Sequence, residues 1–159
     1  MITDYFSLDG KRALITGAGK GIGARIATAF AEMGADVALV ARTQSDLDAV
    51  ADDVRALGRE AHTFACDVTD EAALTSVVQT LTEAWGSLNI LINNAGAPGE
   101  GYGSLKKVTK ARFENTIDIN LTSAYTLTHL ALPLLKAAPQ GSIVNVSSAL
   151  GWMVDRNFA

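Results

Sequence analysis

The chain has 159 residues, of which 48% are hydrophobic and 19% charged, so it has enough apolar side chains for one folded domain, and global disorder is excluded. Its formal net charge of −4 argues against a nucleic-acid-binding protein, which would carry a basic surplus, and its single cysteine excludes an internal disulfide. Since it shows no signal peptide and no apolar run of the ~20 residues that span a bilayer, we expect a cytoplasmic domain without nucleic-acid or membrane partners.

Short apolar runs alternate with longer helical patterns along the chain. The first run is followed by a glycine-rich turn and then by an amphipathic helix, whose apolar residues recur with helical spacing. The alternation continues to a fifth run. We predict strands at 12–16, 36–41, 60–65, 88–93 and 142–146, and helices at 22–33, 43–57, 70–85 and 109–137, the last with a bend near Pro133.

The predicted strands are apolar on both faces, which is typical of a parallel sheet covered by helices on both sides. Right-handed crossovers then predict an α/β fold in which the sheet is doubly wound and lies in the middle of three αβα layers.

The turn between the first strand and the first helix has the spacing Gly-x-x-x-Gly-x-Gly. A diphosphate needs close approach of the backbone, free N–H groups and a positive helix end, and a glycine turn before a helix supplies all three. A tight turn without a ligand is the alternative. A P-loop is excluded because its lysine and hydroxyl residue are not at the required distance from the first glycine. The candidate residues are Gly17, Lys20, Gly21, Ile22 and Gly23.

Two further motifs follow in order, Asn93-Asn94-Ala95-Gly96 after the fourth predicted strand and Asn145-Val146-Ser147-Ser148 after the fifth. Together with the glycine turn, they make the chain resemble the short-chain dehydrogenases/reductases. The resemblance implies a dinucleotide-binding domain over residues 1–159, built on a Rossmann-type sheet with the strand order 3-2-1-4-5. The resemblance implies, in addition, an oxidoreductase that interconverts a secondary alcohol and a ketone by hydride transfer. It also implies that this chain is the N-terminal portion of a longer domain, truncated after its fifth strand.

The residues after the second strand bear on the choice of nicotinamide cofactor. NAD-binding folds place a carboxylate there for the adenosine ribose, but this strand ends in Ala41-Arg42-Thr43. The planar guanidinium of Arg42 suits a phosphate, and Lys20 in the glycine turn lies within reach of the same group. In the family such a pair implies NADP rather than NAD. The alternative is that both are solvated surface charges.

Polar residues follow the third and fourth strands. The resemblance implies that Asp67 and Val68 contact the adenine, and that Asn94, Ala95 and Gly96 lie beside the ribose and brace the central sheet. These residues stand beyond the carboxyl ends of strands, where open α/β sheets bind ligands. The alternatives are that Asp67, Thr69 or Asp70 caps the next helix, and that the asparagines only satisfy backbone groups of the loop.

Reduction of a carbonyl needs a proton donor and a hydrogen-bond donor at the oxygen. The resemblance implies that Ser148 is the hydrogen-bond donor and that Asn120, in the long predicted helix, takes part in a proton relay through water. A core asparagine bonded to backbone is the alternative for Asn120. The family's Tyr-x-x-x-Lys pair would fall beyond Ala159, so we expect these 159 residues to be inactive by themselves.

Other candidate residues are assigned no chemistry. Tyr102 and Lys106 have the Tyr-x-x-x-Lys spacing, but they stand among glycines and precede Ser148, so we expect them to lie in a loop. His62, His129 and Cys66 are interpreted as packing or surface residues, and we predict no metal site.

Two other functions were weighed. A non-catalytic dinucleotide-binding module is the alternative to the enzyme. A methyltransferase is disfavoured because Ala41-Arg42 offers no acidic residue for its ribose. The expected substrate is a small carbonyl compound or alcohol that the sequence does not identify further. The family habit implies a homo-oligomer, a dimer or tetramer, formed through the long helix and the helix that follows it in the family, of which these residues include the first, at 109–137.

Overall fold

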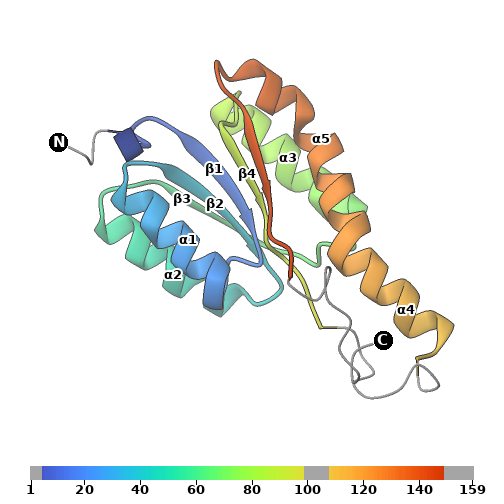
Figure 1. The fold of residues 1–159 in the computed structure, drawn as a ribbon. Helices are drawn as coiled ribbons and strands as arrows, with labels where there is room; N and C mark the ends of the chain where they lie inside the picture. The colour runs from blue at the N-terminus through green and yellow to red at the C-terminus, as the bar shows by residue number, and fades with distance from the viewer. Residues whose placement is uncertain (1–4, 99–107, 149–159) are drawn as a thin grey trace.

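The computed structural model describes residues 5–98 and 108–148. Within these residues five parallel strands form one sheet in the order β3-β2-β1-β4-β5, which confirms the predicted order (Figure 1). Each strand begins and ends within two residues of its predicted bounds. The strands are β1 (Arg12–Thr16), β2 (Asp36–Ala41), β3 (Ala61–Ala65), β4 (Ile90–Asn93) and β5 (Ser142–Asn145).

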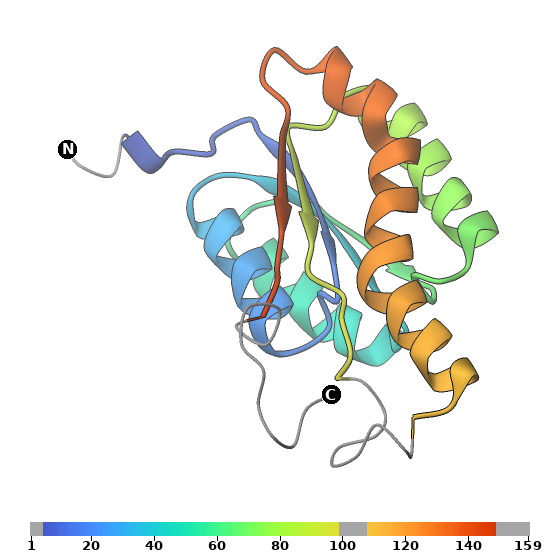
Figure 2. The same cartoon turned by 45° about the vertical axis from the view of Figure 1, so that its right-hand side comes forward.

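Helices cover both faces of the sheet, as a three-layer αβα fold requires (Figure 2). The first two helices lie on one face, and the third and fifth lie on the other (Figure 1). No helix within the described residues is long and apolar enough to cross a membrane. The helices are α1 (Gly21–Glu32), α2 (Gln44–Ala56), α3 (Glu71–Trp85), α4 (Lys110–Ile117) and α5 (Ser123–Ala137).

Successive residues of β1 pack on opposite faces of the sheet, because side chains alternate along a strand. Leu14 belongs to the core beneath α3 and α5, whereas its neighbours Ala13 and Ile15 belong to the core beneath α1 and α2, and all three are fully buried. Burial of a leucine side chain stabilises the folded state by roughly 1.5–3 kcal/mol relative to an exposed leucine. The continuous apolar sequence of the central strands therefore reflects burial on both faces.

β5 departs from the expectation that every strand is covered on both faces. All of its residues are exposed, and Ile143 and Val144 are 43% and 47% exposed. The reason is its position: it stands at the edge of the sheet, where it pairs with β4 among the described residues, while α1 and α2 lie over the other strands (Figure 1). An exposed apolar edge strand is a surface on which further chain can pair.

The predicted helix at 109–137 is helical throughout, but its middle is not α-helical. The π-helix η3 (Asp118–Thr122) joins α4 to α5. Thr109 caps the amino end of α4, where its hydroxyl oxygen accepts a hydrogen bond from the backbone N–H of Arg112 at 3.3 Å. α5 continues as an α-helix through Pro133, so the departure from α geometry lies around Asn120 and not at the proline. Short π segments occur frequently at functional sites.

The register of the sheet brings three loops together. Thr16 lies opposite Val40, and Ile15 lies opposite Ile92, so β1, β2 and β4 end at the same edge. The chain leaves β1 toward β2 on one side and later returns to β4 on the other. Ligands of open α/β sheets bind at such a switch point. The loops that follow these three strands therefore form the candidate site.

Candidate functional site

The turn after β1 depends on two glycines that stand where a side chain would not fit. Gly17 has a φ of +64°, and a Cβ atom there would lie 2.8 Å from the Nδ2 atom of Asn94. A Cβ atom on Gly23, in the first turn of α1, would collide with the carbonyl group of Gly17. α1 therefore packs directly against the turn, which is the close packing that a diphosphate-binding turn requires.

The amino end of α1 opens onto this turn without a side-chain cap. Lys20 is the N-cap residue, has an extended backbone and makes no capping hydrogen bond through its side chain. The first turn of α1 contains no acidic side chain. Open space lies where a Cβ atom of Gly21 would be, and Ile22 is 64% exposed. The first N–H groups and the positive end of the helix dipole are thus placed to bind an anion.

Asn94 fastens the loop after β4 to the end of β1. Its Nδ2 atom donates hydrogen bonds to the carbonyl oxygens of Thr16 at 2.9 Å and Gly17 at 3.3 Å. The hydroxyl oxygen of Thr16 accepts hydrogen bonds from the backbone N–H groups of Asn94 and Ala95, both at 3.0 Å. The asparagine thus satisfies backbone groups, as the alternative interpretation expected, and by doing so it fixes the turn relative to β4.

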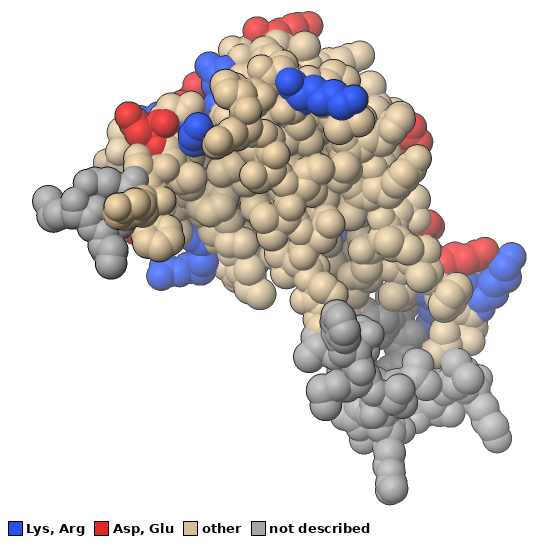
Figure 3. All heavy atoms as spheres, turned by 45° about the horizontal axis from the view of Figure 1, so that its top comes forward, with Lys and Arg blue, Asp and Glu red and all other residues tan. Residues whose placement is uncertain are grey.

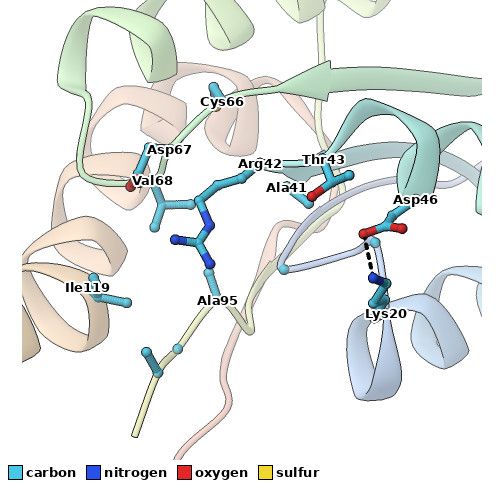
Figure 4. Close-up of a pocket in the computed structure, with 14 residues that line it drawn as sticks. Lys20, Ala41, Arg42, Thr43, Asp46, Cys66, Asp67, Val68, Ala95 and Ile119 are labelled. Atoms are coloured by element: carbon cyan, nitrogen blue, oxygen red, sulfur yellow. Dashed lines mark ion pairs between the residues drawn. The ribbon is translucent and has the colours of Figure 1, made fainter. Parts of the chain in front are cut away.

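A pocket of about 340 Å³ opens at this edge of the sheet (Figure 4). Its walls come from the glycine turn, the residues after β2 and β3, the loop after β4, and η3. The predicted residues that line it are Gly17, Lys20, Arg42, Asp67, Val68, Ala95 and Gly96. The other predicted residues stand behind this lining, in the turn and in the loop that holds it: Gly21, Ile22, Gly23 and Asn94.

Side chains of both charges line the pocket. The Nζ atom of Lys20 lies 3.0 Å from the Oδ2 atom of Asp46, which is in the first turn of α2. The Asp46 side chain is 23% exposed and the Lys20 side chain 79% exposed, so the carboxylate belongs to the wall and the ammonium lies over it. Figure 4 shows Arg42 pointing away from this pair, toward the side formed by Asp67 and Val68.

Asp67 makes a local turn at the far side of the pocket. Its Oδ1 atom accepts hydrogen bonds from the backbone N–H of Thr69 at 2.9 Å and from the Thr69 hydroxyl at 2.8 Å. These bonds, and to a lesser degree the charge of Arg42, hold the pKa of Asp67 below its ordinary value of 3.8. The helix cap that the sequence left open belongs to Asp70, which accepts a hydrogen bond from the backbone N–H of Ala73 at 3.0 Å.

Cys66 lines the pocket as well as packing against the core beneath α3 and α5. Burial raises the pKa of its thiol, and the nearby carboxylates of Asp67 and Asp70 raise it further. The thiol is therefore protonated at neutral pH and is a poor nucleophile. In the part of the chain that the structure describes, no group of three or more His, Cys, Asp or Glu residues is placed to hold a metal ion.

η3 places Asn120 against the loop after β4. Its Oδ1 atom accepts a hydrogen bond from the N–H of Ala97 at 3.1 Å, and its Nδ2 atom donates to the carbonyl oxygens of Ala97 at 3.0 Å and Thr116 at 2.9 Å. A Cβ atom on Gly96 would lie 2.9 Å from the Asn120 Oδ1 atom. Asn120 is thus bonded to backbone, although it is exposed and not in the core, and its neighbour Ile119 lines the pocket.

Ser148 lies at the same edge of the sheet. β5 pairs with β4 up to Asn145 opposite Asn93, so Ser148 follows just beyond the carboxyl end of β5, where it is exposed. Its part in catalysis stays a prediction. Tyr102, Lys106 and residues 149–159 lie outside the described residues.

A comparison with protein families bears directly on this pocket. Residues 11–158 match the family model described as short chain dehydrogenase. The chain belongs to the short-chain dehydrogenase family. The match includes the glycine turn, the pocket and both loops that carry the asparagines, so the protein is assigned to a family of oxidoreductases.

Relatives among the short-chain dehydrogenases differ in cofactor. An uncharacterized oxidoreductase of Mycobacterium tuberculosis is 42% identical over 160 residues, a match that covers 100% of this chain and 60% of the relative. Carveol dehydrogenase from Mycobacterium avium in complex with NAD has a TM-score of 0.88 at 34% identity, over 94% of this chain and 58% of that one. A metagenomic short-chain oxidoreductase in complex with NADP has a TM-score of 0.87 at 36% identity, over 96% of this chain and 68% of that one.

Several lining residues were not predicted from the short-chain dehydrogenase motifs. Only one of them, Asp46, carries a charge. The available signal was its place in the first turn of the predicted helix after Arg42, because such turns face the edge where the strands end. The unpredicted residues are Gly19, Ala41, Thr43, Asp46, Cys66, Ala97 and Ile119.

Proposed function

We propose that the protein is an NADP-dependent oxidoreductase that interconverts a secondary alcohol and a ketone by hydride transfer. Membership of the short-chain dehydrogenases supports oxidoreductase chemistry. The observation that supports NADP is the position of Lys20 and Arg42 in the lining of one pocket, beside the glycine turn. In addition, Arg42 stands directly after β2, where NAD-binding folds place a carboxylate.

The residues of the pocket fit a phosphorylated dinucleotide. The turn at Gly17 and the uncapped end of α1 would hold the diphosphate, because backbone N–H groups and the helix dipole favour anions. Arg42 and Lys20 would hold the 2′-phosphate, for which a guanidinium offers two parallel donors. Val68 would lie against the adenine, and Asp67 would accept a hydrogen bond from its amino group. When bound, the cofactor supplies or accepts the hydride.

Substrate chemistry is proposed for Ser148 and Asn120. The Ser148 hydroxyl would donate a hydrogen bond to the substrate oxygen, which gains negative charge as the carbonyl is reduced. Asn120 is hydrogen-bonded to both the backbone N–H and the carbonyl oxygen of Ala97, and would thereby hold the helix and the loop in place for the proton relay. The proton would come from a Tyr-x-x-x-Lys pair after Ala159, so residues 1–159 expressed alone would bind the cofactor without turning over a ketone.

Assembly and location are part of the same proposal. The surface of α4, η3 and α5 exposes Phe113, Leu121 and Tyr125, which are 59%, 63% and 70% exposed. Apolar surface of this kind supports a homo-oligomer in the whole protein. A cytoplasmic location is proposed together with small-molecule substrates. On the face in Figure 3, basic and acidic side chains are interspersed without a continuous basic patch, which gives no support to a nucleic-acid partner on that face.

The affinities for NADP and NAD, measured by calorimetric titration of the chain and of Arg42→Gln, test the proposed cofactor. We expect the wild-type chain to bind NADP more tightly than NAD. Arg42→Gln should weaken NADP binding by about tenfold or more and leave NAD within about twofold, because a hydrogen bond to a charged group contributes about 1.5–3 kcal/mol.

Arg25→Gln is the matched control, because Arg25 is exposed on α1 and is not part of the pocket lining. Both affinities should be the same as in the wild type. Two results would argue that the arginine does not bind a 2′-phosphate: tighter binding of NAD than of NADP by the wild type, or an equal loss of affinity for both cofactors in Arg42→Gln.

A further inference from the structure

The wall of the pocket beside α2 carries a carboxylate that the residues directly after β2 do not supply. Asp46 comes from the first turn of α2 and lines the pocket together with Arg42 and Thr43. A Cβ atom on Gly19 would lie 3.0 Å from the Asp46 Cβ atom, so the glycine turn packs directly on Asp46. This contact and the helix backbone fix the carboxylate at the pocket, where it is largely shielded from solvent.

Asp46 is paired with one of the two cations that the proposed function assigns to the 2′-phosphate. The Lys20 Nζ atom lies 3.0 Å from its Oδ2 atom, and the Lys20 stem is flexible and mostly exposed. Arg42 points toward Asp67 instead (Figure 4). Among the described residues that line the pocket, the charged side chains are Lys20 and Arg42, opposed by Asp46 and Asp67, so their formal charges sum to zero.

NADP and NAD would place groups of different charge beside Asp46, a 2′-phosphate and a 2′-hydroxyl. A 2′-phosphate brings between about one and two negative charges, must compete with Asp46 for Lys20, and is repelled by the carboxylate that stays in place. A 2′-hydroxyl brings no charge, and a fixed carboxylate can accept a hydrogen bond from it. The same side chain thus disfavours NADP and tolerates NAD.

We propose that Asp46 is a specificity-determining residue, which narrows the preference of this pocket for NADP over NAD so that both cofactors bind. The inference rests on the proposed function, because it assumes that the adenosine ribose lies at the wall shared by Lys20, Arg42 and Asp46.

Asp46→Asn is the direct test, because it keeps the size and an oxygen that can accept from Lys20 but removes the charge. Adenosine 2′,5′-bisphosphate and adenosine 5′-monophosphate differ by the 2′-phosphate alone, and both are titrated calorimetrically into the wild-type chain and the variant. We expect the ratio of their dissociation constants to shift toward the bisphosphate by about three- to tenfold in Asp46→Asn. The shift should shrink at high salt, because salt screens exposed charges.

Two control variants separate this effect from a change in net charge or in folding. Asp48→Asn removes the same charge from the same helix, but Asp48 accepts a hydrogen bond from Gln44 at 2.6 Å and is not part of the lining. Asp48→Asn should leave the ratio within about twofold of the wild type. Asp46→Glu keeps the charge at the pocket, so it should shift the ratio less than Asp46→Asn does. Thermal melts check folding, and Asp46→Ser replaces Asp46→Asn if the latter does not fold.

The outcomes distinguish the inference from the proposed function. An unchanged or reversed ratio in a folded Asp46→Asn overturns the inference alone, provided that the wild type binds the bisphosphate more tightly than the monophosphate. An equal shift in Asp48→Asn also overturns it, because the effect would then come from the helix as a whole. A wild-type chain that binds neither nucleotide overturns the inference and the proposed function together.

Discussion

Gly23 and Gly58 are required by the fold for different physical reasons. Gly23 has ordinary helical backbone, but a Cβ atom there would meet the carbonyl group of Gly17. Gly58 has a φ of +77° with open space around it, so glycine is required there only because other residues rarely adopt this backbone conformation. Gly23 packs on the turn that lines the pocket, whereas Gly58 lies away from it. Substitutions at the two glycines can therefore separate an effect on folding stability from an effect on cofactor binding.

Alanine at each of these glycines should therefore give different results. Gly23→Ala should lower the free energy of unfolding by about 1–3 kcal/mol and weaken NADP binding by about tenfold, because α1 must move away from the turn. Gly58→Ala should cost about 1–2 kcal/mol through left-handed strain and leave NADP binding unchanged. Denaturant unfolding and calorimetric titration measure both quantities. Wild-type affinity in Gly23→Ala would contradict the close packing of α1 on the turn.

At the same scale, the sequence predicts some pocket residues and not others. Lys20 and Arg42 are predictable because the first lies in the glycine turn after β1 and the second directly follows β2, and neighbouring parallel strands end at one edge. Asp46 is not, because its place at the pocket depends on how α2 packs against Gly19. That contact is tertiary, and the local signal, a place in the first turn of the helix after Arg42, does not specify it.

Among the elements, the long helix shows what periodicity misses. The apolar pattern predicts one helix over 109–137 and draws attention to Pro133, whereas the structure has η3 around Asn120. One π turn changes the helical register by a single residue, which a short apolar pattern does not reveal. The available signal was Asn120 itself, a residue of low helix propensity that the helix tolerates because its side chain is bonded to Ala97.

The contact between η3 and the loop after β4 can be tested with Asn120→Ala. Loss of its hydrogen bonds should lower the free energy of unfolding by about 1–2 kcal/mol and speed hydrogen exchange at the Ala97 amide. Asn115→Ala is the control, because Asn115 is exposed on α4, and stability should change by less than about 0.5 kcal/mol. An Ala97 amide that exchanges as slowly in Asn120→Ala as in the wild type would show that Asn120 does not hold the loop.

The strands illustrate how far element prediction reaches. β1 and β2 have the predicted bounds, because their apolar runs are framed by clear turns. β5 also contains adjacent apolar residues, yet its Ile143 and Val144 are exposed. An apolar sequence does not by itself decide the burial of a strand, because the cover over β5 depends on neighbours in space that its own residues do not specify.

At the scale of the whole molecule, the described residues contain more of the proposed cofactor site than of the proposed substrate site. On the proposed cofactor side, the turn, the uncapped helix end, the charged wall and the bracing asparagine meet at one edge. On the proposed substrate side stand Ser148 and Asn120, whose roles are predictions, and the chain spans 60% of the length of the Mycobacterium tuberculosis oxidoreductase. Cofactor binding is therefore a property to test on this chain, and turnover a property of the whole protein.

The position of the 2′-phosphate in a crystal structure of the chain with NADP tests the central claim most directly. We predict that the diphosphate lies over the turn at Gly17, and that the 2′-phosphate lies within about 3 Å of the Arg42 guanidinium and the Lys20 ammonium. Lys20 should then have turned from Asp46 toward the phosphate. A 2′-phosphate that faces solvent away from both cations, or NADP bound outside this pocket, would contradict the account.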